Sequence, residues 1–192
     1  ADSVVFGTQL TDLSIGRIGD AGTWMLNKPT IGAANVLAPT GDPSKLKINE
    51  WLASGAPPFN ADFVELYNPD TLPTPLGGLY ITDNMTGWPT HHQIAPLSFA
   101  PAAGYIKLVA DDDTAAGGNH LAFQLDADRG EIALLDPSQK LIDYLYYSTQ
   151  STGVSEGLSP NGSDTYTYFN LPTPGLANPD AGQTGVVNLA KF

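Results

Sequence analysis

Glycine and proline are spread along the whole chain, and this spacing limits what the chain can fold into. The 192 residues include 20 glycines and 16 prolines, so few intervals between them are long enough for a periodic helical pattern. Both residue types interrupt helices and favour turns, whereas short strands fit between them. The spacing therefore predicts an all-β fold made of short strands.

About nine segments have the residue types expected of strands. Alternation is clearest at 105–110, where Ile106, Leu108 and Ala110 share one face. The turn signal Asp136-Pro137 separates 131–135 from 141–147, so these two segments are expected to pair antiparallel. Short strands with turns between them indicate an antiparallel β-sandwich. The other expected strands are 46–53, 62–68, 79–83, 93–99, 120–125 and 165–169.

The two ends of the chain carry the same residues in the same order. Residues 2–16 match 143–157, and after a two-residue insertion 27–35 match 170–178. This agreement predicts an internal repeat; the alternative is two unrelated hairpins with similar turn chemistry. The recurring positions of the first copy are Asp2, Thr8, Gln9, Thr11, Ser14, Gly16, Asn27, Pro29, Thr30, Gly32, Ala34 and Asn35.

The segment between the two copies has no earlier counterpart, and this predicts the domain organisation. The chain is expected to begin inside the last part of one repeat and then to contain one whole repeat. The expected divisions are 1–36 as the C-terminal part of a preceding repeat, 37–44 as a linker, 45–178 as a complete domain, and 179–192 as a C-terminal extension or linker.

Several motifs between 45 and 178 resemble a known family when taken in order. They are Ile48-Asn49-Glu50-Trp51, 62–68, 76–83, 130–136, 141–143, Ser155-Glu156-Gly157 and Pro172-Thr173-Pro174-Gly175. Together they resemble the lamin-tail domain family in its bacterial secreted, tandem-repeat form. The resemblance implies an immunoglobulin-like β-sandwich without the immunoglobulin disulfide, used as an extracellular module. Arg17 keeps an arginine that the family often has after Ser-x-Gly, whereas Leu158 replaces it in the complete copy.

Charge and composition exclude several classes of protein. Eight lysines and arginines against 20 aspartates and glutamates give a net charge of -12, which repels phosphates, so nucleic acid is not an expected partner. The chain has no cysteine, which excludes disulfides, thiolate catalysis and cysteine zinc sites. No apolar run is long enough to span a membrane, so no membrane insertion is expected.

Two groups of residues are candidates for catalysis. Residues 153–157 fit G-x-S-x-G, but the base histidine should follow the serine, and all three histidines precede it. Ser155 is therefore expected to make a local backbone hydrogen bond in a bend. Glu50 and Glu65 lie on consecutive expected strands, and Glu50 shares its alternation with Ile48 and Leu52. If that face is the core, a structural, hydrogen-bonded glutamate is the favoured interpretation, and we predict that the chain is not an enzyme.

Calcium is the one cofactor that the sequence offers as a candidate. The densest acidic zone has oxygen ligands suited to calcium but lacks EF-hand spacing, so solvated loop charge is the alternative. Its members are Asp111, Asp112, Asp113, Asp126 and Asp128. His91 and His92 are adjacent, and adjacent strand residues point to opposite faces, so both are expected to be surface or loop-edge side chains rather than a metal pair.

Two sets of apolar residues are candidates for interactions. Tyr144 and Tyr146 share one strand face, as do Tyr166 and Tyr168. Packing inside the fold is the favoured interpretation, while exposed rings would stack on sugars or bind a protein partner. Val4 and Phe6 belong to 2–6, which is expected to be a strand able to add to an open sheet edge.

The expected function follows from the repeat, the resemblance and the lack of a catalytic set. It is a non-enzymatic extracellular interaction or structural module of a repeat-containing surface or secreted protein, with a protein partner or self-association. The alternative is a calcium- or polysaccharide-binding accessory domain of a larger secreted hydrolase.

Overall fold

The computed structural model describes residues 2–19 and 22–180. These described residues form fourteen short strands and one short 3-10 turn, η1 (Pro43–Lys45). The prediction of an all-β chain is confirmed, since 35% of the structure is strand and 2% is helix, in several antiparallel sheets. None of the helical structure within these two ranges has the length and apolar character needed to cross a membrane.

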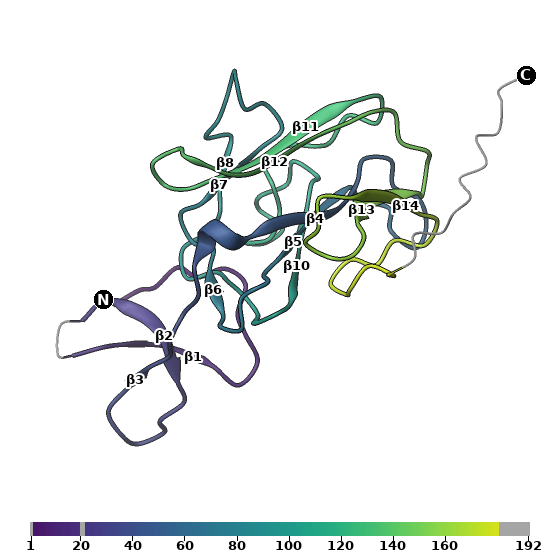
Figure 1. Cartoon of the computed structure of the whole chain (residues 1–192). Helices are drawn as coiled ribbons and strands as arrows, with labels where there is room; N and C mark the ends of the chain where they lie inside the picture. Colours follow the sequence, from purple (N-terminus) through teal and green to yellow (C-terminus); the bar gives the residue numbers. More distant parts are fainter. Residues whose placement is uncertain (1, 20–21, 181–192) are drawn as a thin grey trace, which may run out of the picture.

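The largest sheet has five antiparallel strands and joins distant parts of the chain. Its order is β10 (Tyr105–Val109), β5 (Phe63–Tyr67), β4 (Lys47–Leu52), β13 (Ser155–Leu158) and β14 (Tyr166–Phe169). β4 and β5 are consecutive in the sequence, whereas β13 and β14 come from its far end (Figure 1). β4 therefore connects the two halves of this sheet.

A second sheet has four strands, in the order β12 (Leu141–Tyr147), β11 (Gly130–Leu135), β7 (Tyr80–Thr82) and β8 (His92–Gln93). β11 and β12 pair antiparallel, as predicted. The carboxylate of Asp136 stabilises their turn by accepting from the amides of Ser138 and Lys140 at 2.8 and 2.9 Å. A separate two-stranded sheet pairs β6 (Thr74–Pro75) with β9 (Phe99–Ala100).

The main hydrophobic core is built by both large sheets. β4 and β5 contribute Ile48 and Val64, and β11 and β12 contribute Leu134 and Leu145, all at most 4% exposed. Full burial of such side chains stabilises a fold by about 1.5–3 kcal/mol each. The two sheets are therefore held together by apolar packing.

A three-stranded sheet at one end of the molecule contains β1 (Ser14–Arg17), β2 (Trp24–Lys28) and β3 (Val36–Leu37), as Figure 1 shows. A second, smaller cluster joins it to the rest of the molecule through Phe99 and Leu97. Two backbone hydrogen bonds support this contact: Gly7 N donates to Pro96 O at 3.0 Å, and Phe99 N donates to Thr8 O at 3.1 Å.

Several strand predictions are wrong. Residues 2–6 contain no strand. The expected strand 93–99 is divided between β8 and β9, because Leu97 has a left-handed φ of 53° that no continuous strand accommodates. Residues 120–125 form only isolated bridges at His120 and Gln124. β13 was not expected, since its sequence lacks apolar alternation.

The segment expected as a linker, 37–44, is bonded on both sides. Ala38 N donates to Leu26 O at 2.9 Å, and Gly41 N donates to Pro73 O at 2.8 Å. Of the predicted extension 179–192, residues 181–192 lie outside the described residues, as do positions 1, 20 and 21 of the predicted first part.

Candidate functional site

Glu50 and Glu65 face each other across β4 and β5, and both are 0% exposed. β4 bulges between Ile48 and Glu50, and an extra residue in a strand reverses the face of those that follow. Ile48 and Trp51 therefore enter the main core, while Glu50 lies on the opposite face of the sheet. The expectation that Glu50 shares a face with Ile48 is wrong for this reason.

Glu50 accepts hydrogen bonds from two segments near the end of the chain. Ser155 Oγ donates to Glu50 Oε1 at 2.5 Å. Thr173 donates through its amide at 3.0 and 3.1 Å and through its hydroxyl at 3.2 Å. Ser155 lies buried on β13, so the prediction of a backbone bond in a bend is wrong. Through these hydrogen bonds, Glu50 links β13 and the turn at Thr173 to β4.

Glu65 makes the corresponding bonds one strand further along. Asn49 Nδ2 donates to Glu65 Oε1 at 2.9 Å, and the amide of Gly175 donates to Oε2 at 2.6 Å. Asn49, the bulged residue, also donates to Asn161 Oδ1 at 2.9 Å. The bulge thus places an amide where it bonds both the glutamate and the loop after β13.

Asn178 bonds both β4 and β13 through its side-chain amide. Its Nδ2 donates to Asn49 O at 3.1 Å and to Leu158 O at 2.9 Å. This approach requires glycine at 157, because a Cβ there would lie 2.8 Å from Asn178 Nδ2 and 2.6 Å from Asn49 O. We call this set the glutamate clamp; its members are Asn49, Glu50, Glu65, Ser155, Gly157, Thr173, Gly175 and Asn178.

The electrostatics of the clamp follow from burial. Burial raises the pKa of Glu65 to about 8, against the bonds from Asn49 and Gly175 that lower it. Burial likewise raises the pKa of Glu50, while the bonds from Ser155 and Thr173 lower it. Fully buried carboxyl groups whose oxygens already accept hydrogen bonds are suited to holding strands together, in line with the structural interpretation of Glu50.

The N-terminal part of the chain shares three local features with the clamp. Thr30 O accepts from Ala33 N at 3.0 Å, as Thr173 O accepts from Leu176 N at 2.9 Å. Glycine at positive φ follows two residues later in both turns, at 76° for position 32 and 87° for position 175. Asn35 Nδ2 donates to Arg17 O at 2.8 Å, as Asn178 Nδ2 does to Leu158 O.

The strand registers of the two parts differ by one residue from the sequence match. Ser14 pairs with Asn27, whereas Ser155 pairs with Phe169. Asn27 and Phe169 are both buried, while Asn170, the sequence match of Asn27, is exposed. The structure therefore does not place Asn27 and Asn170 in equivalent positions.

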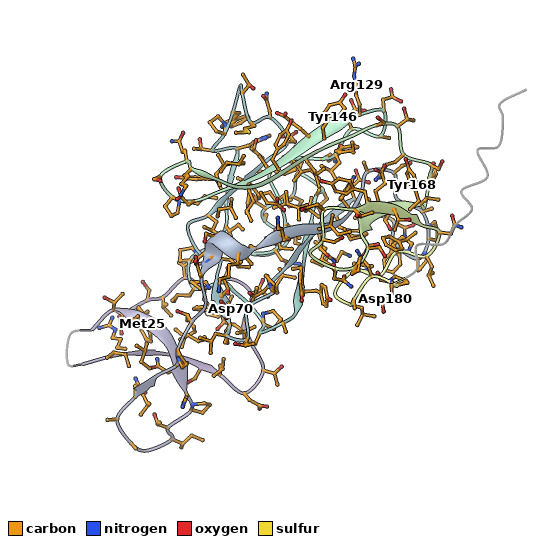
Figure 2. The ribbon with its side chains drawn as sticks, in the orientation of Figure 1. Met25, Asp70, Arg129, Tyr146, Tyr168 and Asp180 are labelled. Carbon is orange, nitrogen blue, oxygen red and sulfur yellow. The ribbon has the colours of Figure 1, made fainter. Side chains whose placement is uncertain are left out.

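The four candidate tyrosines are exposed, so the favoured interpretation that they pack inside the fold is wrong. Their exposed fractions are 39% for Tyr144, 60% for Tyr146, 51% for Tyr166 and 44% for Tyr168. One pair lies on β12 and the other on β14, on different sheets (Figure 2 labels Tyr146 and Tyr168). Alternation identified which residues share a face but not whether that face is covered.

The remaining interaction candidates lie at the N-terminal segment. Val4 is half-buried and lines a hollow of about 590 Å³ together with Trp24 and Leu97. Phe6 is 56% exposed. Neither lies on a strand, so the prediction that 2–6 is a strand able to add to an open sheet edge is wrong.

The calcium candidates do not converge. Asp111 bonds His120 Nδ1 at 2.8 Å and accepts from the amide of Asp113 at 3.2 Å, while Asp126 accepts from the amide of Asp128 at 2.8 Å. Asp112 is exposed in the same loop. Within the described ranges, no three acidic, histidine or cysteine side chains gather as a metal site would require.

The two adjacent histidines are half-buried rather than on the surface. His91 bonds Asp83 Oδ1 at 2.7 Å and stacks on Trp88 with ring centroids 3.9 Å apart. His92 accepts from Ala122 N at 3.2 Å, and burial lowers its pKa. The two rings therefore make separate contacts.

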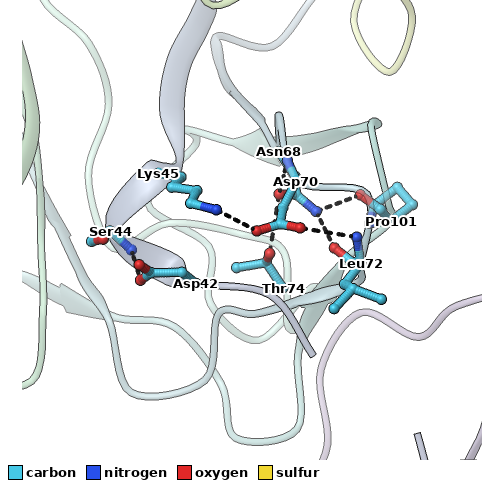
Figure 3. A network of polar contacts seen from close by, with 8 residues as sticks. All are labelled: Asp42, Ser44, Lys45, Asn68, Asp70, Leu72, Thr74 and Pro101. Atoms are coloured by element: carbon cyan, nitrogen blue, oxygen red, sulfur yellow. Dashed lines mark hydrogen bonds and ion pairs between the residues drawn. The ribbon is translucent and has the colours of Figure 1, made fainter. Parts of the chain in front are cut away.

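A second polar network, which the sequence did not predict, joins η1 to the loop after β5 (Figure 3). Lys45 Nζ lies 2.9 Å from Asp70 Oδ2, and this bond lowers the pKa of Asp70. Asn68 Nδ2 donates to Leu72 O and Pro101 O, both at 2.9 Å. The signal available in the sequence was Asn68-Pro69-Asp70, a turn motif whose side chains bond nearby backbone.

Among the family models, curated proteins and solved structures that we compared, none matches this chain. The contacts described above are therefore the basis for assigning it a role.

Proposed function

We propose that this chain is a non-enzymatic extracellular module of a repeat-containing surface or secreted protein. In this proposal it acts through protein contacts in adhesion, surface architecture or subunit assembly. The underlying fold is an immunoglobulin-like β-sandwich of the lamin-tail kind, and residues 2–36 are the closing part of a preceding repeat.

One observation carries the proposal: the polar groups that the sequence offered for chemistry bond to each other, while aromatic groups face solvent. Ser155 and both glutamates are 0% exposed, and their side chains are hydrogen-bonded within the glutamate clamp. The four tyrosines of β12 and β14 are between 39% and 60% exposed, and exposed aromatic side chains are typical of interface anchors.

The clamp supports the proposed repeat. Its turn, its positive-φ glycine and its asparagine bond all have counterparts between residues 16 and 35. Shared contacts of this kind are expected when two segments are copies of one supersecondary unit.

The proposal is tested by binding of the purified chain to the cell surface of its source organism. We expect the paired changes Tyr144→Ser with Tyr146→Ser, and Tyr166→Ser with Tyr168→Ser, to weaken binding by about tenfold, since aromatic anchors dominate interfaces. Leu171→Ser is the control, because Leu171 is 63% exposed but lies outside both strands.

Two outcomes would contradict the proposal. Binding that survives both tyrosine pairs at unchanged melting temperature would remove its basis. Turnover of ester, peptide or glycoside substrates that is lost in Ser155→Ala, in a variant that still folds, would instead establish an enzyme.

A polysaccharide-binding accessory domain is the second candidate, because paired tyrosines on one strand face also suit stacking on sugar rings. A rise in melting temperature with a glycan, absent from the tyrosine variants, would favour it. The same measurement across millimolar calcium tests the calcium alternative.

A further inference from the structure

Five of the residues that recur at the two ends of the chain bond β4, or the residue after it, in residues 45–178, which we call the complete part. Asp143 Oδ2 accepts from Ile48 N at 2.8 Å. Gln150 accepts from Ala53 N at 2.5 Å and donates to Trp51 O at 3.3 Å. Ser155 and Thr173 donate to Glu50, and Asn178 donates to Asn49 O. Five side chains thus hold one strand from end to end.

Each of these five side chains has an identical counterpart in the N-terminal part: Asp2, Gln9, Ser14, Thr30 and Asn35. The counterparts make other contacts. Asp2 pairs with Arg17 at 2.6 Å, with both side chains exposed. Gln9 Nε2 donates to Leu97 O at 2.9 Å. The five residues are present, but in the described chain no strand lies between them as β4 lies between their counterparts.

The hydroxyl of Thr30 shows most directly what is missing. Thr173 Oγ1 donates to Glu50 at 3.2 Å, whereas Thr30 Oγ1 is buried and has no hydrogen-bond partner among the described residues. Ser14 Oγ has only a long bond of 3.5 Å to Asn27 O. Buried hydroxyls without a partner are costly, so this position favours an acceptor brought in from outside.

The backbone of β1 is open on the same side. β13 has β14 on one edge and β4 on the other, while β1 has β2 on one edge and no strand on the other in the described ranges. Gly157 lets the backbone of β4 approach, since a Cβ there would lie 3.1 Å from Glu50 Cα. The corresponding residue on β1 is again glycine, Gly16.

We propose that β1, together with Asp2, Gln9, Ser14, Thr30 and Asn35, is an open receptor for a glutamate-bearing β-hairpin of the β4–β5 type. The hairpin is supplied by a polypeptide segment outside the described residues and pairs antiparallel with β1. Its glutamate accepts hydrogen bonds from Ser14 and Thr30. This inference rests on the proposed function of an interaction module and names its partner.

The chemistry of the occupant is fixed by the complete part. It carries Asn-Glu on the strand that pairs with β1 and a second glutamate on the next strand, as Asn49, Glu50 and Glu65 do. A second folded copy of this chain is a poor donor, because its own Glu50 is 0% exposed and its β4 already pairs with β5 and β13. Donating that strand would require opening the five-stranded sheet.

The experiment titrates the intact chain with a synthetic peptide of residues 45–68, which contains β4, β5 and their connection. Amide resonances and amide exchange of the chain are the readouts. We expect saturable shifts and slowed exchange at residues 14–17, and binding about tenfold weaker for a peptide carrying Glu50→Ala, since the carboxylate supplies the charged hydrogen bonds.

Matched variants of the chain locate the site. Thr30→Val should weaken the peptide by about tenfold, because it removes a donor to the incoming carboxylate. It should fold normally, since that hydroxyl has no partner among the described residues to lose. Thr11→Val, at an exposed threonine, should leave the affinity unchanged. Tyr146→Ser should also leave it unchanged, so this binding and the binding that tests the proposed function fail independently.

Three results would overturn the inference. One is the absence of any change at residues 14–17 with peptide in the millimolar range. Another is an affinity that is insensitive to both Glu50→Ala in the peptide and Thr30→Val in the chain. The third is a dimer that protects the same amides without peptide, which would make a second copy the occupant.

Discussion

Ser155 and Ser14 match in the sequence repeat, but in the described residues β13 is an internal strand of the five-stranded sheet, whereas β1 is an edge strand of the three-stranded sheet. β13 is flanked on both sides and Ser155 is fully buried, whereas β1 is flanked on one side and Ser14 is only half-buried. Five side chains that bond β4 or the residue after it in residues 45–178 recur in the N-terminal part of the sequence. The difference is consistent with the proposal that these residues receive a strand, and that the serine becomes fully buried when the strand is bound.

The largest expected effect comes from removing the carboxylate that distinguishes the two hairpins. Glu50→Ala leaves the buried Ser155 and the half-buried Thr173 as donors without their acceptor, so we expect the free energy of unfolding to fall by about 3–5 kcal/mol. Urea unfolding measures it. Asp128→Ala, at an exposed acid, is the control and should change stability by less than about 0.5 kcal/mol. A loss below about 1 kcal/mol for Glu50→Ala would mean that the clamp does not hold β13.

We expect a pH dependence of stability from the buried Glu65 of the complete part. Burial raises the pKa of Glu65 from 4.5 to about 8, so the folded state binds this proton more tightly than the unfolded state. The resulting stability is fully present below pH 4.5 and is lost as pH rises through 8. We expect the wild-type chain to lose on the order of 3–4 kcal/mol between pH 5 and 8.

Glu65→Gln removes the titrating group, so its unfolding free energy should be flatter over the same pH range. Chemical unfolding at four pH values measures the slope. Asp136→Asn is the control: bonds from Ser138 and Lys140 lower the pKa of Asp136, so its contribution is lost only as pH falls below about 3.8. Equal slopes for the wild type and Glu65→Gln would refute the buried, protonated glutamate.

Replacing each of the two matching glycines by alanine should distinguish β13, which has a described strand on both edges, from β1, which has one on a single edge. A Cβ at Gly157 would meet the backbone oxygen of Asn49 at 2.6 Å, whereas at Gly16 its three nearest neighbours would be side-chain atoms, the first of them Asn35 Nδ2 at 2.6 Å. We expect Gly157→Ala to cost about 2 kcal/mol, because β4 must shift, and Gly16→Ala less than about 1 kcal/mol. Thermal unfolding compares them, and an equal cost would show that the β4 backbone is not the obstacle.

The smallest expected difference concerns the two matching asparagines. Asn178→Ala loses two buried bonds, to Asn49 O and Leu158 O, while Asn35→Ala loses one exposed bond to Arg17 O. The expected costs are about 2 and about 0.5–1 kcal/mol. If the peptide of residues 45–68 occupies β1, the cost of Asn35→Ala should rise toward that of Asn178→Ala in its presence.

Turn chemistry made much of the fold predictable. The spacing of glycine and proline indicated an all-β chain, and the turn at Asp136 correctly predicted the pairing of β11 with β12. These features depend on local backbone preferences, which the sequence states directly. The recurrence of Ser-x-Gly and Thr-x-Gly marked residues that later proved to contact β4.

The remaining errors arise where a tertiary contact overrides the local pattern. The bulge at Asn49 is stabilised by hydrogen bonds to Glu65 and to Asn161, of which Asn161 lies more than a hundred residues away in the sequence. No pattern of alternation in the sequence indicates this bulge. β13 pairs through a buried serine and a glycine, which carry little strand propensity. Tyr146 and Leu145 follow ordinary alternation, but only the assembled sheet determines which of the two faces water.

The order in which the chain is synthesised gives the Glu50 bonds a further consequence. Glu50 and Thr173 are 123 residues apart, so a ribosome has made β4 and β5 long before the segment that covers them. Contacts between distant residues slow folding and leave strand edges open meanwhile. During that interval the new chain exposes the β4–β5 hairpin, with Glu50 on an unpaired strand edge. In our proposal, β13 and the turn at Thr173 then compete for this edge with any open edge strand that resembles β1.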